Sequence, residues 1–290
     1  MKQTIILMAC LTTFLSCEVK DNGTDIDLSG YTRFNVDMEA ISMSGDLTEQ
    51  RAWNEGDMIG VFGSDQGDNV GFYLKEDSQG KTVADFYGPV VKGADIIAYF
   101  PYSRTVEKEA EGLPCELASQ QILDTDQSSL EHFLAYSTRA FASLDDNKEF
   151  HFAYPLGMLE VVIGLDETIV MTGASLTGSL PISGRFLVNA GLSVSATDLA
   201  SEYISLDFNG QEIYSKVGDE YAVLRFVIPP ALYSAGDLIL KLQEKNGEVM
   251  EVQLGHVTVE RVDCSSFSVS SITVGVSDIP ELDINDGYLE

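Results

Sequence analysis

The sequence predicts an all-β protein made of two tandem antiparallel β-sandwich domains. Beyond residue 30, short runs of alternating apolar and polar residues recur throughout the chain, separated by turn signals. Alternation with a period of two is typical of strands that bury one face. Helical stretches are few, and only the segment 128–144 could form a helical turn or two. Frequent short strands with few helices favour antiparallel sandwiches.

The sharpest local signals are two Asn-Gly pairs, Asn209-Gly210 and Asn246-Gly247, each placed between two strand-like runs. Both central residues of a tight two-residue turn take a positive φ, which Asn and Gly tolerate. We therefore expect a hairpin at each pair. The flanking runs are 203–208 with 211–214 and 238–244 with 249–254, and further strands are expected at 31–37, 57–63, 70–75, 94–100, 148–154, 158–165, 222–228, 255–262 and 267–276.

A domain boundary is expected near residue 155. There the stretch "HFAYPLGMLEVVIGL" places Pro155 and Gly157 between two strands, and these residues interrupt regular structure. The division gives an N-terminal sandwich at 31–155 and a C-terminal sandwich at 156–290, each near the usual size of a domain.

Composition and charge restrict the partners. The 290 residues are 44% hydrophobic, which indicates a folded protein, and 17 basic against 46 acidic residues give a formal charge of −29. Such a charge excludes nucleic acid and anionic lipid headgroups as favourable partners. It is typical of a well-solvated surface.

The N-terminus predicts export and lipid attachment. Lys2 and the apolar run from Ile5 to Leu15 fit a signal peptide at 1–16, and the following "LSC" resembles the bacterial lipobox. In that case Cys17 carries acyl chains such as palmitate, which anchor the protein to the outer membrane. The alternative is an ordinary signal peptide with an incidental cysteine. The polar, acidic residues 17–30 then form a flexible tether.

Two cysteines, Cys115 and Cys264, remain after lipidation and removal of the signal peptide. In an oxidising compartment they could pair. Two separate thiols are the alternative, because the two residues are expected in different domains.

No motif predicts an enzymatic reaction. There is no GxSxG, and His132, His151 and His256 form no HxH or HExxH pattern. The stretch 78–82 lacks the first glycine of a phosphate-binding loop, and 124–131 lacks the turn glycine and final glutamate of a calcium loop. We predict no catalytic residue, no cofactor and no metal site.

Four segments carry a family resemblance. The stretches "RAWNEGDMIGVF" (51–62), "IIAYFPYS" (96–103), "FHFAYPLGMLEVVI" (150–163) and "RFVIPPALYSAGDLILKL" (225–242) resemble, in this order, the fimbrillin-like (Mfa-like) family of bacterial surface lipoproteins. The likeness runs from about residue 45 to the end. Tyr154 stands where the family usually has a histidine, and the terminal "DINDG" lacks the family's tryptophan.

The resemblance implies two transthyretin-like β-sandwiches and a non-enzymatic role as a fimbrial (pilus) subunit, anchor or adhesin at the cell surface. It implies other fimbrial subunits or surface lipoproteins as partners, and it assigns no host or bacterial ligand. In such subunits an Arg-specific protease removes an N-terminal segment with the first strand, and a neighbouring subunit donates a strand to the groove. An open sheet edge leaves N–H and C=O groups unpaired, which a partner strand satisfies.

On this resemblance, the exchanged strand is 31–40 and the cleavage site is Arg51, after the polar loop 42–50. Alternatively, Arg51 only places its charge in solvent, and the uncut N-terminus serves as the anchor. The acidic tail 277–290 could serve as a donor strand or as a closing strand. Pro280 and its many acids make it a poor edge-pairing element, which favours a closing strand. The residues assigned to strand exchange are Tyr31, Arg33, Asn35 and Asp37.

The second functional hypothesis is a glycan-binding surface lipoprotein of a polysaccharide-uptake system. Such proteins use exposed aromatic platforms, and Trp53 is the only tryptophan. We expect Trp53 to pack over the end of a core sheet, after which Gly56-Asp57 turns the chain into a strand. Gly60 within that strand predicts a bulge or a close backbone approach.

Overall fold

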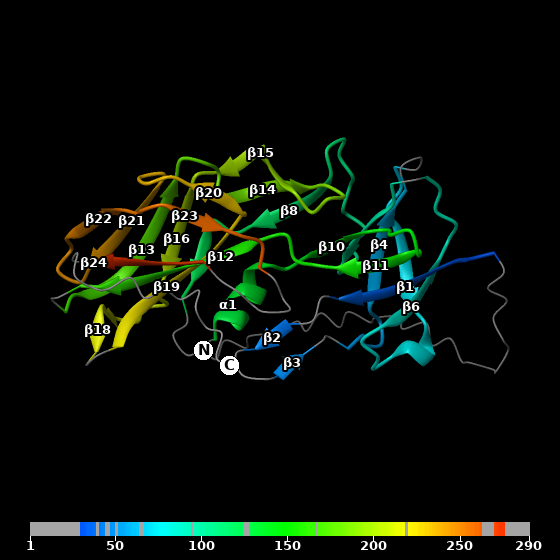
Figure 1. Cartoon of the computed structure of the whole chain (residues 1–290), viewed down its shortest axis with the longest axis horizontal. Helices are drawn as coiled ribbons and strands as arrows, with labels where there is room; N and C mark the ends of the chain where they lie inside the picture. The colour runs from blue at the N-terminus through cyan, green and yellow to red at the C-terminus, as the bar shows by residue number, and fades with distance from the viewer. Residues whose placement is uncertain are drawn as a thin grey trace, which may run out of the picture. The chain divides into compact units, whose positions relative to one another are not determined.

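The computed structural model describes residues 30–38, 41–43, 47–49, 52–63, 67–93, 95–123, 128–165, 168–217, 220–262 and 270–275. From Tyr31 onward the chain forms one compact unit. Within it, strands dominate and one α-helix, α1 (Ser129–Tyr136), is present among the described residues (Figure 1). The all-β class predicted from the sequence is confirmed.

Seven strands form the first sheet, which contains most of the N-terminal strands. In spatial order they are β10 (Ala140–Ser143), β7 (Ile97–Phe100), β4 (Met58–Phe62), β5 (Val70–Leu74), β6 (Ala84–Gly88), β1 (Thr32–Met38) and β11 (Glu149–Phe152). The two end strands meet through isolated bridges, Phe141 to Ala153 and Leu144 to Phe150. The sheet therefore closes on itself.

The interior of this closed sheet is aromatic, and Trp53 is fully buried in it. Its ring meets Phe86 and Phe100 edge-on at centroid distances of 5.0 and 5.2 Å. Such edge-to-face pairs add to the stabilisation that burial supplies. The predicted burial of Trp53 is confirmed.

Three larger sheets and two short pairs hold the other strands (Figure 1). The first sheet has the order β18 (Lys216–Val217), β19 (Glu220–Ile228), β12 (Gly157–Gly164) and β24 (Ser270–Gly275). The second has the order β22 (Val249–Gln253), β21 (Leu238–Glu244), β13 (Val170–Gly178), β16 (Tyr203–Asp207) and β9 (Gln120–Ile122), and β17 (Ile213–Tyr214) also pairs with β13. The third has the order β15 (Val194–Ser201), β14 (Ser183–Val188) and β8 (Leu113–Leu117). The short pairs are β2 (Ile41–Met43) with β3 (Leu47–Glu49), and β20 (Ala231–Tyr233) with β23 (Val257–Val259).

Strand pairing crosses residue 155. β8 and β9 precede this residue, yet β8 pairs with β14 and β9 with β16. An apolar cluster also combines Leu113, Phe133 and Phe141 with Met158 and Val227. Both sides of residue 155 thus share backbone pairing and core. The division into 31–155 and 156–290 stays a prediction.

Three strand pairs are parallel, which corrects the expectation of purely antiparallel sheets. They are β1 with β11, β12 with β24, and β16 with β9. Alternating hydrophobicity shows which face of a strand is buried, but it does not encode strand direction. Parallel partners cannot be joined by a tight turn, so no local signal marks them.

The two Asn-Gly pairs have different outcomes. Asn246-Gly247 joins β21 to β22 in a hairpin, as predicted, although of the two only Gly247 has a positive φ, 89°. At Asn209-Gly210 both φ angles are positive, 53° and 73°, but the predicted hairpin is wrong. β16 and β17 do not pair with each other there, since both pair with β13.

Several other local predictions can be compared with the structure. The helix predicted within 128–144 is confirmed as α1, and its last part is strand β10 instead. The loop predicted at 42–50 contains most of the β2–β3 pair. Gly60 leaves room for the ring of Tyr99, whose Cε1 lies 2.1 Å from where a Cβ would stand, so the group that approaches it is a side chain and not the predicted backbone.

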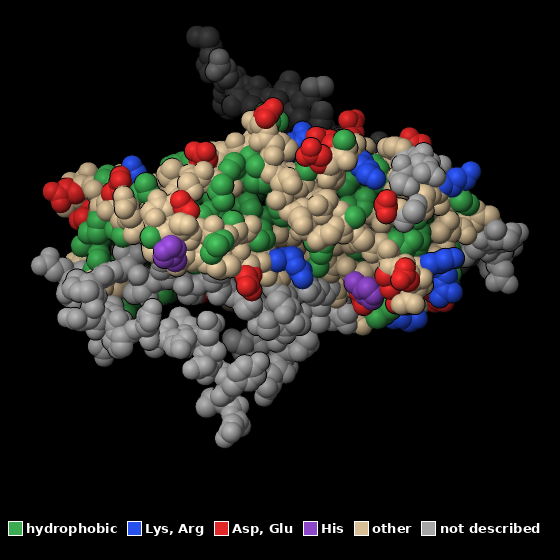
Figure 2. Space-filling model, turned by 45° about the horizontal axis from the view of Figure 1, so that its top comes forward, with side chains coloured by type: hydrophobic (Ala, Val, Ile, Leu, Met, Phe, Trp, Pro, Cys, Tyr) green, Lys and Arg blue, Asp and Glu red, His purple; other side chains and the backbone are tan. Residues whose placement is uncertain are grey.

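The visible face in Figure 2 carries acidic side chains spread over its length, with basic and apolar side chains between them. Within the described residues, no helix has the length and apolar character needed to cross a membrane.

Candidate functional site

The predicted exchange strand β1 occupies an interior position in the closed sheet. On one side it pairs antiparallel with β6, from Thr32 opposite Gly88 to Val36 opposite Ala84. On the other it pairs parallel with β11, from Asn35 to Met38 (Figure 1). β1 is therefore held by backbone pairing along both edges.

The core-facing side of β1 carries Phe34, Val36 and Met38, each at most 2% exposed. The Phe34 ring lies 4.8 Å from that of Phe150 on β11 and 5.2 Å from that of Phe72 on β5. Burying an aliphatic or aromatic side chain of this size contributes roughly 1.5–3 kcal/mol each. These three side chains bind β1 to the interior.

The outward face of β1 carries the residues that the sequence assigned to strand exchange. Tyr31 is exposed just before the strand, and Asn35 is half-buried. Arg33 donates from Nε to Asp85 Oδ1 on β6 at 2.9 Å, and Asp37 lies 2.8 Å from His151 Nδ1 on β11. The outward row thus attaches β1 to both neighbouring strands.

The core-facing row was not singled out from the sequence, although its alternation is visible there. Phe34, Val36 and Met38 alternate with polar residues over the whole strand. A strand held in a groove is recognised by this inward row, because side-chain pockets give strand addition its specificity.

The predicted cleavage residue Arg51 lies outside the described residues, and the structure begins again at Ala52. Directly after it, the Trp53 amide donates to Lys81 O at 2.9 Å, and its indole Nε1 donates to Thr82 O at 3.1 Å. Gly56, with φ at 83°, then turns the chain into β4, as predicted. The segment that follows Arg51 is therefore anchored in the core.

Three further predicted features lie outside the described residues: the lipidation site Cys17, Cys264, and the acidic tail 277–290. Cys115 is a free, buried thiol, and burial raises its pKa to about 12. Its pairing with Cys264 stays open.

The histidines lie in three separate places. His132 is fully buried on α1, and His256 is exposed between β22 and β23. His151 alternates with the buried Phe150 and Phe152 on β11, so it lies on the outward face of the sheet.

The two loop motifs have structural roles. Ser128 accepts from the Glu131 amide while Glu131 accepts from the Ser128 amide, so the calcium-like stretch ends in a helix capping box. Gly80, with φ at 75°, lies in the hairpin turn between β5 and β6.

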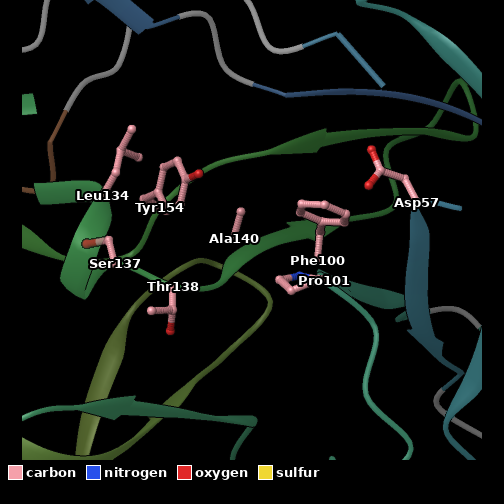
Figure 3. A pocket seen from close by; sticks show the side chains of 8 residues that line it. All are labelled: Asp57, Phe100, Pro101, Leu134, Ser137, Thr138, Ala140 and Tyr154. Atoms are coloured by element: carbon pink, nitrogen blue, oxygen red, sulfur yellow. The ribbon is translucent and has the colours of Figure 1, made fainter. Parts of the chain in front are cut away.

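A shallow depression of about 480 Å³ lies beside the end of α1 (Figure 3). Its lining residues are Asp57, Phe100, Pro101, Leu134, Ser137, Thr138, Ala140 and Tyr154. In Figure 3 the hydroxyls of Ser137 and Thr138 point away from Ala140 at its centre. Ligand sites converge polar groups on the ligand, so we assign no ligand to this depression.

No family model matches the sequence, and no curated protein matches it. Solved structures do match. A "putative cell adhesion protein" from Bacteroides ovatus is 13% identical with a TM-score of 0.49, and the match covers 84% of this chain and 92% of that chain.

Two fimbrial proteins from Porphyromonas gingivalis also match. The tip protein Mfa3, with a C-terminal truncation, is 12% identical with a TM-score of 0.38, covering 77% of this chain and 81% of its own. The anchor protein Mfa2 is 10% identical with a TM-score of 0.35, covering 77% and 82%. The chain thus has structural matches, at low identity and over most of their length, to proteins described as cell adhesion and fimbrial proteins.

Proposed function

We propose that this protein is a non-enzymatic, lipid-anchored protein of the bacterial outer surface that acts as a fimbrial subunit, anchor or adhesin and assembles by β-strand addition. Its acyl anchor is Cys17, and its exchangeable strand is β1. Two tandem transthyretin-like domains divided near residue 155 belong to the same proposal. Its partners are other fimbrial subunits or surface lipoproteins.

The observation that carries the proposal is the two-sided pairing of β1. When β1 leaves, β6 and β11 face each other across a gap, and both present unpaired N–H and C=O groups. The gap also loses Phe34, Val36 and Met38 from its interior. An incoming strand with apolar residues at alternate positions pairs with the exposed N–H and C=O groups and also refills the apolar interior.

Arg51 is well placed for release because it separates β1 from the core anchor at Trp53. Arg33, by contrast, lies within β1, where it stands opposite Tyr87 of β6. A cut after Arg51 leaves the rest of the closed sheet attached to the protein and frees β1 together with Cys17.

The glycan-binding alternative requires an exposed aromatic platform, which Trp53 does not supply. Trp53 has no exposed surface. The exposed tyrosines Tyr31, Tyr73, Tyr203 and Tyr214 lie at or beside different strands.

The test uses the purified full-length protein carrying Arg104→Gln, since Arg104 is exposed and offers a competing site. An Arg-specific protease should create a new N-terminus at Ala52, and Arg51→Gln should block this cut. The cleaved protein should then take up a labelled peptide of residues 30–40. A peptide with Phe34 and Val36 replaced by serine should not bind.

An intact protein that resists cutting at Arg51, or a cleaved protein that excludes the peptide, would contradict strand exchange. The anchor is tested separately. Cys17→Ser should abolish incorporation of labelled palmitate and release the protein from the membrane fraction.

A further inference from the structure

Three structural elements bring four metal-ligating or metal-orienting side chains to one spot on the surface. Asp145 lies in the turn after β10, and Glu149 and His151 lie two residues apart on the same face of β11. Asp37 on β1 stands directly across from His151 in the parallel register. Asp145, Glu149 and His151 lie close together in the sequence, and the pairing of β1 with β11 adds the distant Asp37 to them.

The imidazole of His151 is the centre of the cluster. Its Nε2 lies 3.9 Å from Asp145 Oδ2 and 3.9 Å from Glu149 Oε2. One donor atom from each of the three residues lies within 4.8 Å of the others. Two oxygens and one nitrogen therefore converge on a common point.

Asp37 orients the ring. Its Oδ1 lies 2.8 Å from His151 Nδ1, which therefore donates as N–H. In the neutral ring this fixes the tautomer and leaves the lone pair on Nε2, directed at the two carboxylates. A carboxylate behind the non-coordinating nitrogen is the usual outer partner of a metal-bound histidine.

Asp145 is held in place from the other side. Its Oδ1 accepts from the backbone amides of Asn147 at 2.9 Å and Glu149 at 2.7 Å. Its Oδ2 accepts from Asn147 Nδ2 at 3.2 Å and lies 3.9 Å from His151 Nε2. Among the described residues, no lysine or arginine pairs with Asp145 or Glu149. His151 is thus the basic group that these carboxylates face, and their combined negative field favours a cation at this point.

We propose that Asp145, Glu149 and His151 bind one zinc-class divalent cation at the surface, with Asp37 as the residue that positions the histidine. Zinc binds imidazole nitrogen and carboxylate oxygen at about 2 Å in tetrahedral geometry, so its donors lie about 3.3 Å apart. The two 3.9 Å separations need a closure of about 0.6 Å each. Calcium and magnesium take oxygen ligands and do not favour an imidazole.

Bound metal links the β10–β11 turn to β11 and, through Asp37, to β1. The proposal does not depend on the fimbrial role, because it requires only the observed positions of these four side chains.

The test uses untagged, metal-free full-length protein titrated with zinc chloride by calorimetry. We expect saturable binding of one Zn²⁺ per chain. His151→Gln should abolish it, and Asp145→Asn or Glu149→Gln should weaken it at least tenfold. Asp37→Asn should weaken it by roughly 10- to 100-fold, the usual loss when an outer partner is removed.

His256→Gln is the matched control, since it removes another exposed histidine and should leave zinc binding unchanged. A thermal melt of each variant checks that the fold persists. Cobalt substitution adds a spectroscopic signature, because the visible absorption of bound Co²⁺ should vanish in His151→Gln. Absence of saturable zinc binding, or equal binding by wild type and His151→Gln, would overturn the proposal.

Discussion

His132 shows how a single buried residue makes the fold sensitive to acid. Its side chain is fully buried on α1, which packs against β19. Burial, together with the positive charge of Arg225, lowers the pKa of the imidazole from 6.5 to about 4, against the opposing charge of Glu160. Between about pH 6.5 and pH 4, His132 is protonated in the unfolded chain but neutral in the folded protein.

Stability should therefore fall as the pH decreases from about 6.5 toward 4, by an amount on the order of 3 kcal/mol from this residue alone. His132→Leu removes the titrating group. The free energy of unfolding of this variant, measured by urea denaturation at pH 7 and pH 4.5, should fall less than that of the wild type. The variant His256→Gln, at an exposed position, should lose as much stability between pH 7 and pH 4.5 as the wild type. An equal loss in all three proteins would contradict the role of His132 in acid sensitivity.

At this scale the sequence was informative wherever one residue's role follows from its neighbours. Trp53 beside an apolar run was interpreted correctly as core entry, whereas Gly60 within that run makes room for the Tyr99 ring and not for a neighbouring backbone. The histidine cluster was missed because Asp145, Glu149 and His151 match no standard metal motif. Their orienting partner, Asp37, lies on a strand more than a hundred residues earlier, and only the fold brings it near.

At the scale of elements, β1 depends on its inward row more than on its outward one. Phe34 lies within 5.2 Å of two other aromatic rings, while Asn35 is half-buried on the opposite face. Outward contacts such as the pair of Arg33, whose side chain is 58% exposed, with Asp85 contribute at most about 1 kcal/mol in water.

Phe34→Ala should therefore lower the stability of the protein by roughly 3–5 kcal/mol, whereas Asn35→Ala should change it by about 0.5 kcal/mol or less. Native-state hydrogen exchange locates the effect. Amides of β1 and of the facing edges of β6 and β11 should lose more protection in Phe34→Ala than those of β21 and β13. Similar exchange in both variants would show that the inward row does not hold β1.

Most strands with clear alternation were predicted, and those that lack it were missed. β15, with the sequence VSATDLAS, is polar and largely exposed, so it carries little periodic signal. β13 contains Gly, Ser and Thr at positions where larger residues would mark its faces. β10 was interpreted as part of a helix because its small residues suit either structure, and tertiary pairing with β7 decided the outcome.

At the scale of the whole molecule, the chain order of strands is a poor guide to their spatial order. The first strand pairs in parallel with β11, and the late strand β24 pairs in parallel with the next strand, β12. The segment around Pro155 thus connects β11, the partner of β1, to β12, the partner of β24. Non-local pairing of this kind depends on matched faces and available edges, which are properties of the folded sheet and not of any local sequence.

The strands and apolar cluster that span residue 155 predict how the protein unfolds. Because β8 and β9 complete sheets formed by later strands, neither half can lose its structure without exposing apolar surface of the other. We therefore expect one cooperative transition for the whole unit. Trp53, the only tryptophan, reports on the closed N-terminal sheet by fluorescence, while far-UV circular dichroism reports on all strands.

In guanidinium titrations the two signals should give the same midpoint and the same dependence on denaturant, as a two-state transition requires. Leu113→Ala removes a side chain from the shared cluster and should shift both curves together, by roughly 2–5 kcal/mol. Leu240→Ala, in the cluster formed mainly by later strands, is the matched control and should also move the Trp53 signal. If Leu240→Ala shifted the circular dichroism curve while the fluorescence curve stayed in place, the two halves would unfold independently.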